Sequence, residues 1–162
     1  MPIIPLFSTP GGRQIRVGYA PAESDTNLFG GNSNRRGPIW FPVNYLIIEA
    51  LERYHHHYGD DLKVEMPTGS GNWCNLQQVA DELSLRLTRL FMADEGGRRP
   101  CFGNAPPYPN DPEFRGMVLF HEYFDGDNGK GLGAEHQTGW TALVVRCLEN
   151  VKNSLTNRQK AQ

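Results

Sequence analysis

Apolar side chains recur at helical spacing in three separate stretches of this chain. Residues 43–58 form the first, and Gly59 follows them where a helix can end. The face predicted to be apolar holds Leu46, Ile47, Ala50, Leu51 and Tyr54. We therefore predict a helix that buries this face and stops at Gly59.

The second stretch begins at Leu76, and Asn75 before it is a suitable N-cap. Its apolar positions, three and four residues apart, are Leu76, Val79, Leu83, Leu87 and Leu90. Gly96 is the predicted end of this helix, because glycine readily adopts the conformation that terminates one.

The third stretch follows Thr138, which we predict to be its N-cap. Its apolar stripe is formed by Trp140, Leu143, Val144, Cys147, Leu148, Val151 and Leu155. Three such helices predict a mainly α protein.

Glycine, proline and polar residues dominate the segments between these helices. Within the first 41 residues only residues 13–20 alternate as a short strand would. The prolines of residues 98–116 exclude a long regular element, and residues 117–124 suit either a short strand or a helical turn.

Length and composition predict one domain with a modest core. The chain has 162 residues, which is enough for a single hydrophobic core. We divide it into a loop-rich entry segment at 1–41, helices and loops at 42–155, and a tail at 156–162.

Charge and cysteine content narrow the choice of partners and compartment. The net charge is -2 without a basic stripe, so we expect no nucleic-acid partner. The sequence contains no run of 18 apolar residues that would predict a membrane span, and its first residues do not resemble a signal peptide. The three separated cysteines indicate neither a disulfide framework nor zinc. We predict a cytoplasmic chain without metal or cofactor.

Each tryptophan stands at or just before a predicted helix start, in a polar loop. A sugar offers apolar C–H faces and a rim of hydroxyls, so its site needs aromatic surfaces together with fixed donors and acceptors. The loops supply these as Arg36, Trp40, Asn44, Asn72, Trp73, Gln137 and Trp140. If alternate helices run parallel, the loops gather at one end. Ordinary packing of each tryptophan is the alternative.

Other interpretations of the polar motifs are weaker. Residues 125–136 begin like a calcium loop, but Lys130 and His136 stand where glycine and a bidentate glutamate are required. The glycines of this loop lack the βαβ context of a dinucleotide site. Histidines 55–57 are consecutive on a predicted helix and cannot converge on one ion.

Three blocks together resemble one enzyme family. They are "GGNSNRRGPIWFPVN", "PTGSGNWCNLQQVADELSLRLTRLF" and "HEYFDGDNGKGLGAEHQTGWTALV". In combination they are similar to the C-terminal part of glycoside hydrolase family 63-like proteins, which include processing α-glucosidases and mannosylglycerate hydrolase-like enzymes. Arg35 and Glu135 depart from the family's pattern, in which an aromatic and a small residue are usual.

The resemblance implies the closing arc of an (α/α)6 barrel with long Gly/Pro-rich loops and an inverting mechanism. It assigns the general base to Glu122, with His121 and Tyr123 beside it in the site. It places Trp40, Asn44, Gln137 and Trp140 around the sugar, and we add Arg36, His121 and Tyr123 as predicted substrate-binding residues. The general acid of such enzymes is an upstream aspartate that nothing here matches, so we expect the isolated chain to be inactive.

The predicted function is therefore hydrolysis of α-glucosides or α-mannosides, with a carbohydrate as the substrate partner. Two alternatives stay open, a non-catalytic carbohydrate-binding remnant and a helical interaction domain. An apolar edge left by absent helices would pair with the missing half of the barrel or with a second copy.

Overall fold

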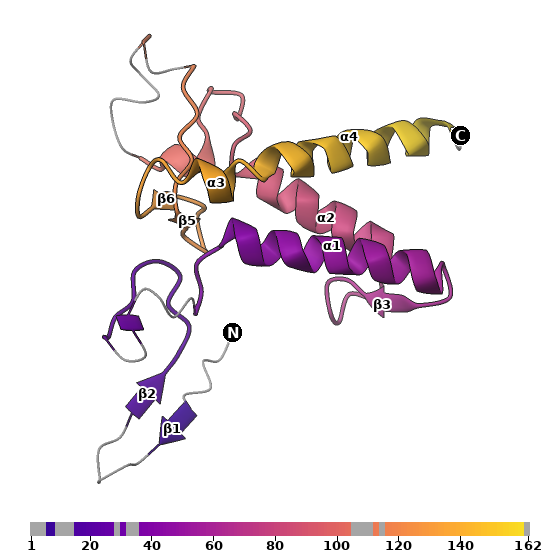
Figure 1. The fold of residues 1–162 in the computed structure, drawn as a ribbon, viewed down its shortest axis with the longest axis horizontal. Helices are drawn as coiled ribbons and strands as arrows, with labels where there is room; N and C mark the ends of the chain where they lie inside the picture. The colour runs from indigo at the N-terminus through magenta and orange to yellow at the C-terminus, as the bar shows by residue number, and fades with distance from the viewer. Residues whose placement is uncertain are drawn as a thin grey trace.

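The structure is a computed structural model that describes residues 6–8, 15–27, 30–31, 36–104, 112–113 and 116–160. Within these residues the fold is mainly helical, as the sequence predicts (Figure 1). The helices are α1 (Phe41–Tyr58), α2 (Leu76–Arg89), α3 (Thr138–Thr141) and α4 (Val144–Lys160), with a 3-10 turn at Pro100–Phe102.

The described residues also form short antiparallel strand pairs. They are β1 (Leu6–Ser8) with β2 (Ile15–Val17), β3 (Lys63–Glu65) with β4 (Trp73–Asn75), and β5 (Tyr123–Phe124) with β6 (Gly131–Leu132). The strand predicted within residues 13–20 is confirmed as β2. The sequence of residues 117–124 suited either a short strand or a helical turn. The structure forms a strand there, at Tyr123–Phe124.

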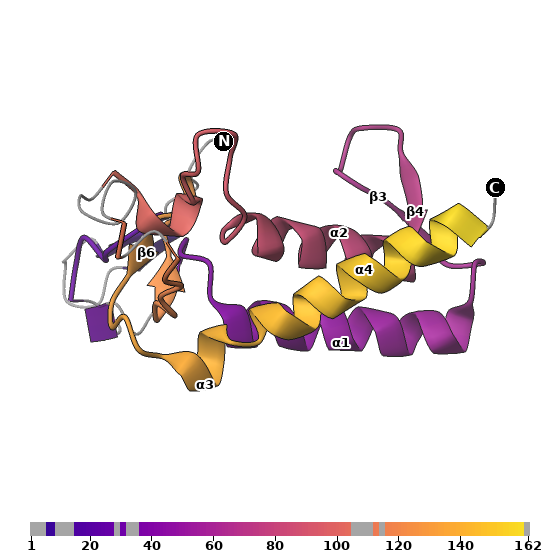
Figure 2. The ribbon, with the colours of Figure 1, turned by 90° about the horizontal axis from the view of Figure 1, so that it is seen from above.

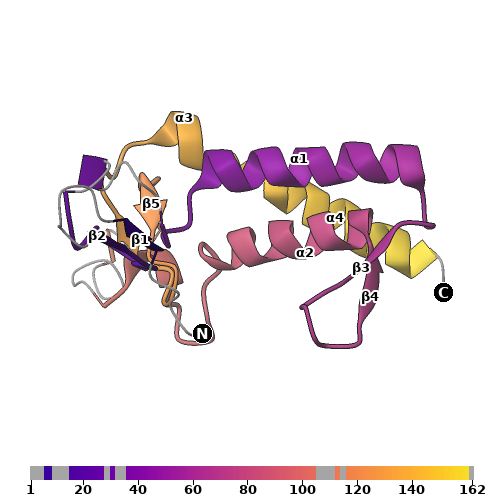
Figure 3. The same cartoon turned by 90° about the horizontal axis from the view of Figure 1, so that it is seen from below.

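Helix α2 packs against both α1 and α4. It runs back along α1 after the β3–β4 hairpin, whereas α4 starts at the same end of the molecule as α1 (Figures 2 and 3). The entry loops of α1 and α4 therefore gather at one end, beside β5 and β6. Trp73, at the start of β4, lies at the other end and is 64% exposed. The prediction that Trp73 gathers with Trp40 and Trp140 was wrong. Because α2 runs antiparallel to α1, the loop that enters α2 lies at the opposite end from the loop that enters α1 (Figures 2 and 3).

The core lies where the three long helices meet the β5–β6 hairpin. At its centre Phe41 and Phe124, both fully buried, have ring centroids 5.6 Å apart. Phe91 closes a triangle with them, at 5.9 Å from Phe41 and 5.6 Å from Phe124. Ile48, Ala80 and Cys147 extend this core along the helices.

The buried face of α1 differs from the predicted one. Phe41 and Ile48 are buried, and of the predicted residues Leu51 packs against the core. Leu46, Ile47 and Tyr54, in contrast, are 68%, 47% and 56% exposed. Both sides of the helix carry apolar residues, so periodicity alone did not decide which side faces α2.

The ends of two helices also differ from the predictions. α2 stops at Arg89 rather than at Gly96, because the following backbone turns and the Cys101 N–H donates to the Leu90 carbonyl at 2.9 Å. The predicted third helix is divided into α3 and α4, and Thr138 is a residue of α3 rather than its cap.

The start of α2 confirms the predicted cap. The Asn75 side chain accepts from the Gln78 backbone N–H at 2.8 Å, and the Gln78 side chain accepts from the Asn75 N–H at 2.9 Å. This reciprocal pair satisfies two backbone donors that a helix start otherwise leaves without partners.

Replacing Asn75 with alanine should lower the free energy of unfolding by about 1 kcal/mol, since the side-chain acceptor is lost. Urea denaturation followed by far-UV circular dichroism measures the change. Asn75→Ser is the matched control, because serine keeps an acceptor and should retain most of the stability. Equal losses in both variants would contradict a capping role.

Candidate functional site

The segment from Phe120 to Phe124 ties together the loops that the sequence singles out. Ile39 and Phe124 exchange backbone hydrogen bonds of 2.8 and 3.0 Å. The Gln137 N–H donates to the Phe120 carbonyl at 2.8 Å, and the Thr141 hydroxyl donates to the His121 carbonyl. The entry loops of α1 and α3 are thus fixed to one extended segment that carries Glu122.

Trp40 and Trp140 form an aromatic pair beside this segment. Their ring centroids are 5.2 Å apart and their planes meet at 79°, which is an edge-to-face contact. Both tryptophans are half-buried. Trp40 follows Ile39 in the chain and Trp140 precedes Thr141, and these two neighbours are hydrogen-bonded to the Phe120–Phe124 segment. The structure therefore brings two of the predicted sugar-site residues into contact, although 100 positions separate them.

Glu122 is half-buried and lies against the turn at Gly133 and Ala134. Its backbone N–H donates to the Ala134 carbonyl at 2.8 Å, and its carboxylate accepts from the Ala134 N–H at 3.5 Å. Gly133 has a φ of +71°, and a Cβ there would lie 2.7 Å from the Glu122 Oε2 atom. Only glycine gives this turn both its left-handed backbone and the space for the carboxylate.

Tyr123 links the neighbourhood of Glu122 to the entry segment of the chain. Its side chain is 3% exposed, and its hydroxyl donates to the Glu23 carboxylate at 2.9 Å. A Cβ on Gly133 would also lie 2.8 Å from the Tyr123 Cε1 atom, so the tyrosine ring and the Glu122 carboxylate flank the same turn. Sequence reasoning missed Glu23, because no periodicity or motif marks it within its loop.

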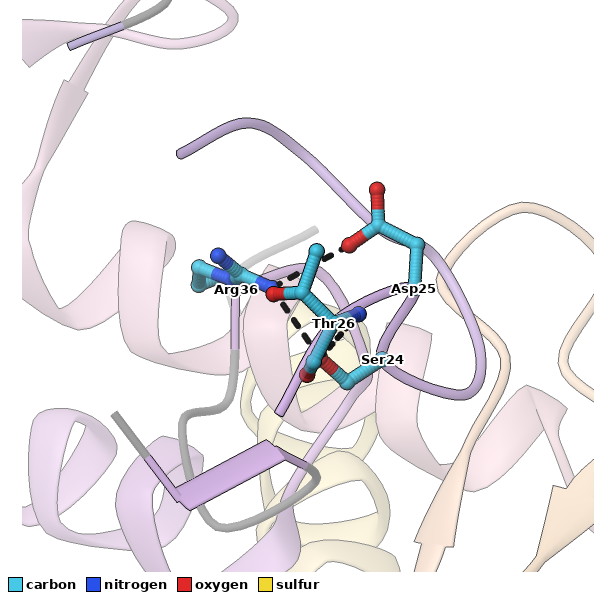
Figure 4. A network of polar contacts seen from close by, with 4 residues as sticks. All are labelled: Ser24, Asp25, Thr26 and Arg36. Atoms are coloured by element: carbon cyan, nitrogen blue, oxygen red, sulfur yellow. Dashed lines mark hydrogen bonds and ion pairs between the residues drawn. The ribbon is translucent and has the colours of Figure 1, made fainter. Parts of the chain in front are cut away.

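Arg36 is engaged by the same entry segment (Figure 4). Its guanidinium donates to the Ser24 hydroxyl at 3.0 Å and to the Asp25 carboxylate at 3.4 Å, and its side chain is 10% exposed. The Ser24 hydroxyl in turn donates to the Thr26 carbonyl at 2.7 Å. Arg36 thus fixes the turn that follows Glu23, and its contact with a sugar remains a prediction.

Asn44 and Gln137 stabilise the loop ends that carry the tryptophans. The Asn44 side-chain amide donates to the Trp40 carbonyl at 2.8 Å. The Gln137 carbonyl accepts from the N–H groups of Trp140 and Thr141, both at 3.0 Å. Their roles at the substrate stay predictions. Arg35 lies outside the described residues.

His121 is buried at 7% exposure, with its ring over Gly131 and near Phe124. A Cβ on Gly131 would lie 2.1 Å from the imidazole, so glycine is required for this close approach. Burial lowers the pKa of His121 below its ordinary value, and the negative charge of Glu135 offsets only part of the effect.

This depressed pKa predicts a pH-dependent stability. The unfolded chain takes up a proton at His121 more readily than the folded chain as the pH falls through about 6.5. Wild-type stability should therefore fall relative to His121→Gln between about pH 7.5 and about pH 5.5, in urea denaturation at each pH. His56→Gln removes an exposed imidazole as the control. A pH-independent difference between wild type and His121→Gln would contradict burial of a neutral ring.

No cluster of histidine, cysteine and carboxylate side chains suited to a metal ion occurs among the described residues. In the loop that begins like a calcium site, one Asp125 oxygen accepts from the Asp127 and Asn128 N–H groups at 2.8 and 3.2 Å. The Asp125 carboxylate therefore stabilises the turn in which it lies.

A cavity of about 960 Å³ lies beside the end of α2, away from the residues predicted for the sugar. It is lined in part by Arg89, Met92, Arg98 and Lys130, and Arg98 forms an ion pair with Asp94 at 3.2 Å. None of the residues predicted to bind a sugar lines it.

Comparison with known proteins gives two similar chains. Over 149 residues, 91% of this chain, it is 52% identical to the "Uncharacterized protein YMR196W" of Saccharomyces cerevisiae. Over 147 residues, 90% of this chain, it is 27% identical to mannosyl-oligosaccharide glucosidase of the same yeast. The matched segment is 14% of each of these relatives. No protein-family model and no solved structure matches.

The second relative supports a glycoside hydrolase resemblance at the level of a distant match. No helix within the described ranges combines the length and apolar character that crossing a bilayer requires.

Proposed function

We propose that this chain provides the general base and an aromatic wall of a glycoside hydrolase site of the family 63-like, inverting type. The supporting observation is that Ile39 and Thr141, the chain neighbours of Trp40 and Trp140, are hydrogen-bonded to the extended segment that contains Glu122, while the two indole rings contact each other. The distant similarity to mannosyl-oligosaccharide glucosidase agrees with this chemistry. The substrate class is an α-glucoside or α-mannoside, and the general acid comes from polypeptide outside this sequence.

In the proposed reaction, Glu122 accepts a proton from a water molecule whose oxygen attacks the anomeric carbon. The bond from that carbon to the leaving oxygen breaks, and the acid protonates the leaving oxygen. Inverting enzymes hold the two carboxyl groups about 6.5 to 9.5 Å apart, so that water fits between the base and the sugar.

The surroundings of Glu122 suit the role of a positioned base. The Ala134 N–H and the glycine turn restrict the carboxylate, and the buried Tyr123 beside it is held by Glu23. Trp40 and Trp140 offer apolar surface for the C–H faces of a sugar ring. Restricting the base in this way lowers the entropic cost of reaching the reactive arrangement.

Sugar binding without turnover is the second candidate function, and the tryptophan pair favours it for the isolated chain. Without an acid to protonate the leaving group, hydrolysis loses a factor of about 10² to 10⁴. Titration of the isolated chain with α-glucosides, followed by tryptophan fluorescence, separates binding from the absence of any sugar site.

The deciding experiment uses a chimera in which this chain replaces the matched segment of the uncharacterized yeast protein. We expect the purified chimera to hydrolyse members of a panel of α-glucosides and α-mannosides, and the isolated chain to hydrolyse none. Inversion is checked by following the anomer first released with NMR. A folded chimera without activity on the whole panel would refute the proposed function.

A further inference from the structure

Helix α1 carries a second apolar face, opposite the one that packs on α2. Phe41 and Ile48 on the inner side are fully buried. On the other side the exposed residues Val43, Ile47 and Tyr54, with the half-buried Ala50, are spaced by four, three and four positions. That spacing places them on one stripe of a helix.

This outer stripe is broad and open. We define it as Val43, Leu46, Ile47, Ala50, Tyr54 and Tyr58, and its five large side chains are 47–68% exposed. Helix α1 forms an edge of the helical layer (Figure 3). A helix that is apolar on both sides is typical of the interior of a larger protein.

The size of the stripe argues against a second copy of this chain as its partner. The 18 residues of α1 span about 27 Å, and one helix face is about 10 Å wide. The stripe can therefore bury roughly 270 Å² on each side, whereas a stable dimer needs about 800 Å² per partner. A segment of the same polypeptide needs less area, because it avoids most of the entropy cost of association.

The relatives supply a source for such a segment. This chain matches only 14% of each of them, so most of their polypeptide lies outside the match. We propose that the outer stripe is the docking surface for an amphipathic helix from the polypeptide that corresponds to this remainder. The helix packs its own apolar residues between Val43, Ile47 and Tyr54. This proposal does not depend on sugar hydrolysis.

The test compares one variant in two contexts, with stability rather than activity as the readout. In the chimera defined above, Ile47→Glu should lower the apparent melting midpoint by about 5 °C or more, since it places a charge in a closed contact. In the isolated chain the same change should leave the midpoint and the circular dichroism spectrum unaltered, because Ile47 is exposed there.

Two matched variants complete the design. His56→Glu changes an exposed residue of α1 outside the stripe, and Ile47→Leu keeps the apolar contact. Neither should shift the midpoint of the chimera appreciably. Equal effects of Ile47→Glu and His56→Glu in the chimera would overturn the proposal, as would destabilisation of the isolated chain by Ile47→Glu. A defined dimer of the isolated chain in light scattering, dissociated by Ile47→Glu, would assign the stripe to a second copy instead.

Discussion

Replacing Glu122 with glutamine should lower kcat of the active chimera by a factor of about 10² to 10⁴. Glutamine keeps the size of the side chain and can still accept from the Ala134 N–H, but it cannot take a proton from water. The proposed binding surface formed by Trp40 and Trp140 is unchanged, so KM should move much less than kcat. Steady-state kinetics with the best substrate of the panel measures both constants.

The matched control is Glu149→Gln, which removes an exposed carboxylate on α4 that pairs with Arg146 at 3.2 Å. It should leave kcat within about twofold of the unmodified chimera, since surface pairs of this kind contribute little. Turnover by Glu122→Gln equal to that of the control would exclude Glu122 as the base. The melting midpoints of both variants show whether a loss of activity is a loss of folding.

Replacing Phe124 with alanine should destabilise the chain by about 3–5 kcal/mol, the range found when a large aromatic residue is removed from a core. Phe124 is fully buried and contacts the rings of Phe41 and Phe91. Its backbone also pairs with Ile39 and its strand with β6, so the cavity would open next to the segment that carries Glu122.

Urea denaturation gives the change in the free energy of unfolding. Phe124→Leu should cost less, because leucine fills most of the volume. Val145→Ala truncates a side chain that is 55% exposed and should cost under about 1 kcal/mol. A loss for Phe124→Ala as small as that for Val145→Ala would mean that the aromatic triangle does not organise the core.

Helix positions were predictable because they depend on neighbours in sequence. The spacing of apolar residues in α1 and α2 depends on contacts within a few residues, and so does the Asn75 cap. The end of α2 was not predictable, since the backbone leaves the helix to form a long-range bond from Cys101 to Leu90. The outward face of α1 was not predictable either, because both of its sides are apolar.

The candidate site was predictable only in its residue types. Resemblance of the "HEYF" block pointed to Glu122, and the loops pointed to Trp40 and Trp140. The contact between Tyr123 and Glu23 spans 100 positions and leaves no local pattern. The same holds for the turn of Ser24, Asp25 and Thr26 that Arg36 secures.

The sequence by itself determined that the chain is mainly helical, where α2 begins, and which blocks resemble a glycoside hydrolase. Those features follow from short-range spacing and from motifs. The tertiary structure alone decided that Trp40 meets Trp140 while Trp73 lies at the far end, and that one apolar face of α1 is left uncovered. The reason is physical: the direction of each helix and the choice of its buried face are set by packing between distant segments, which no local pattern records.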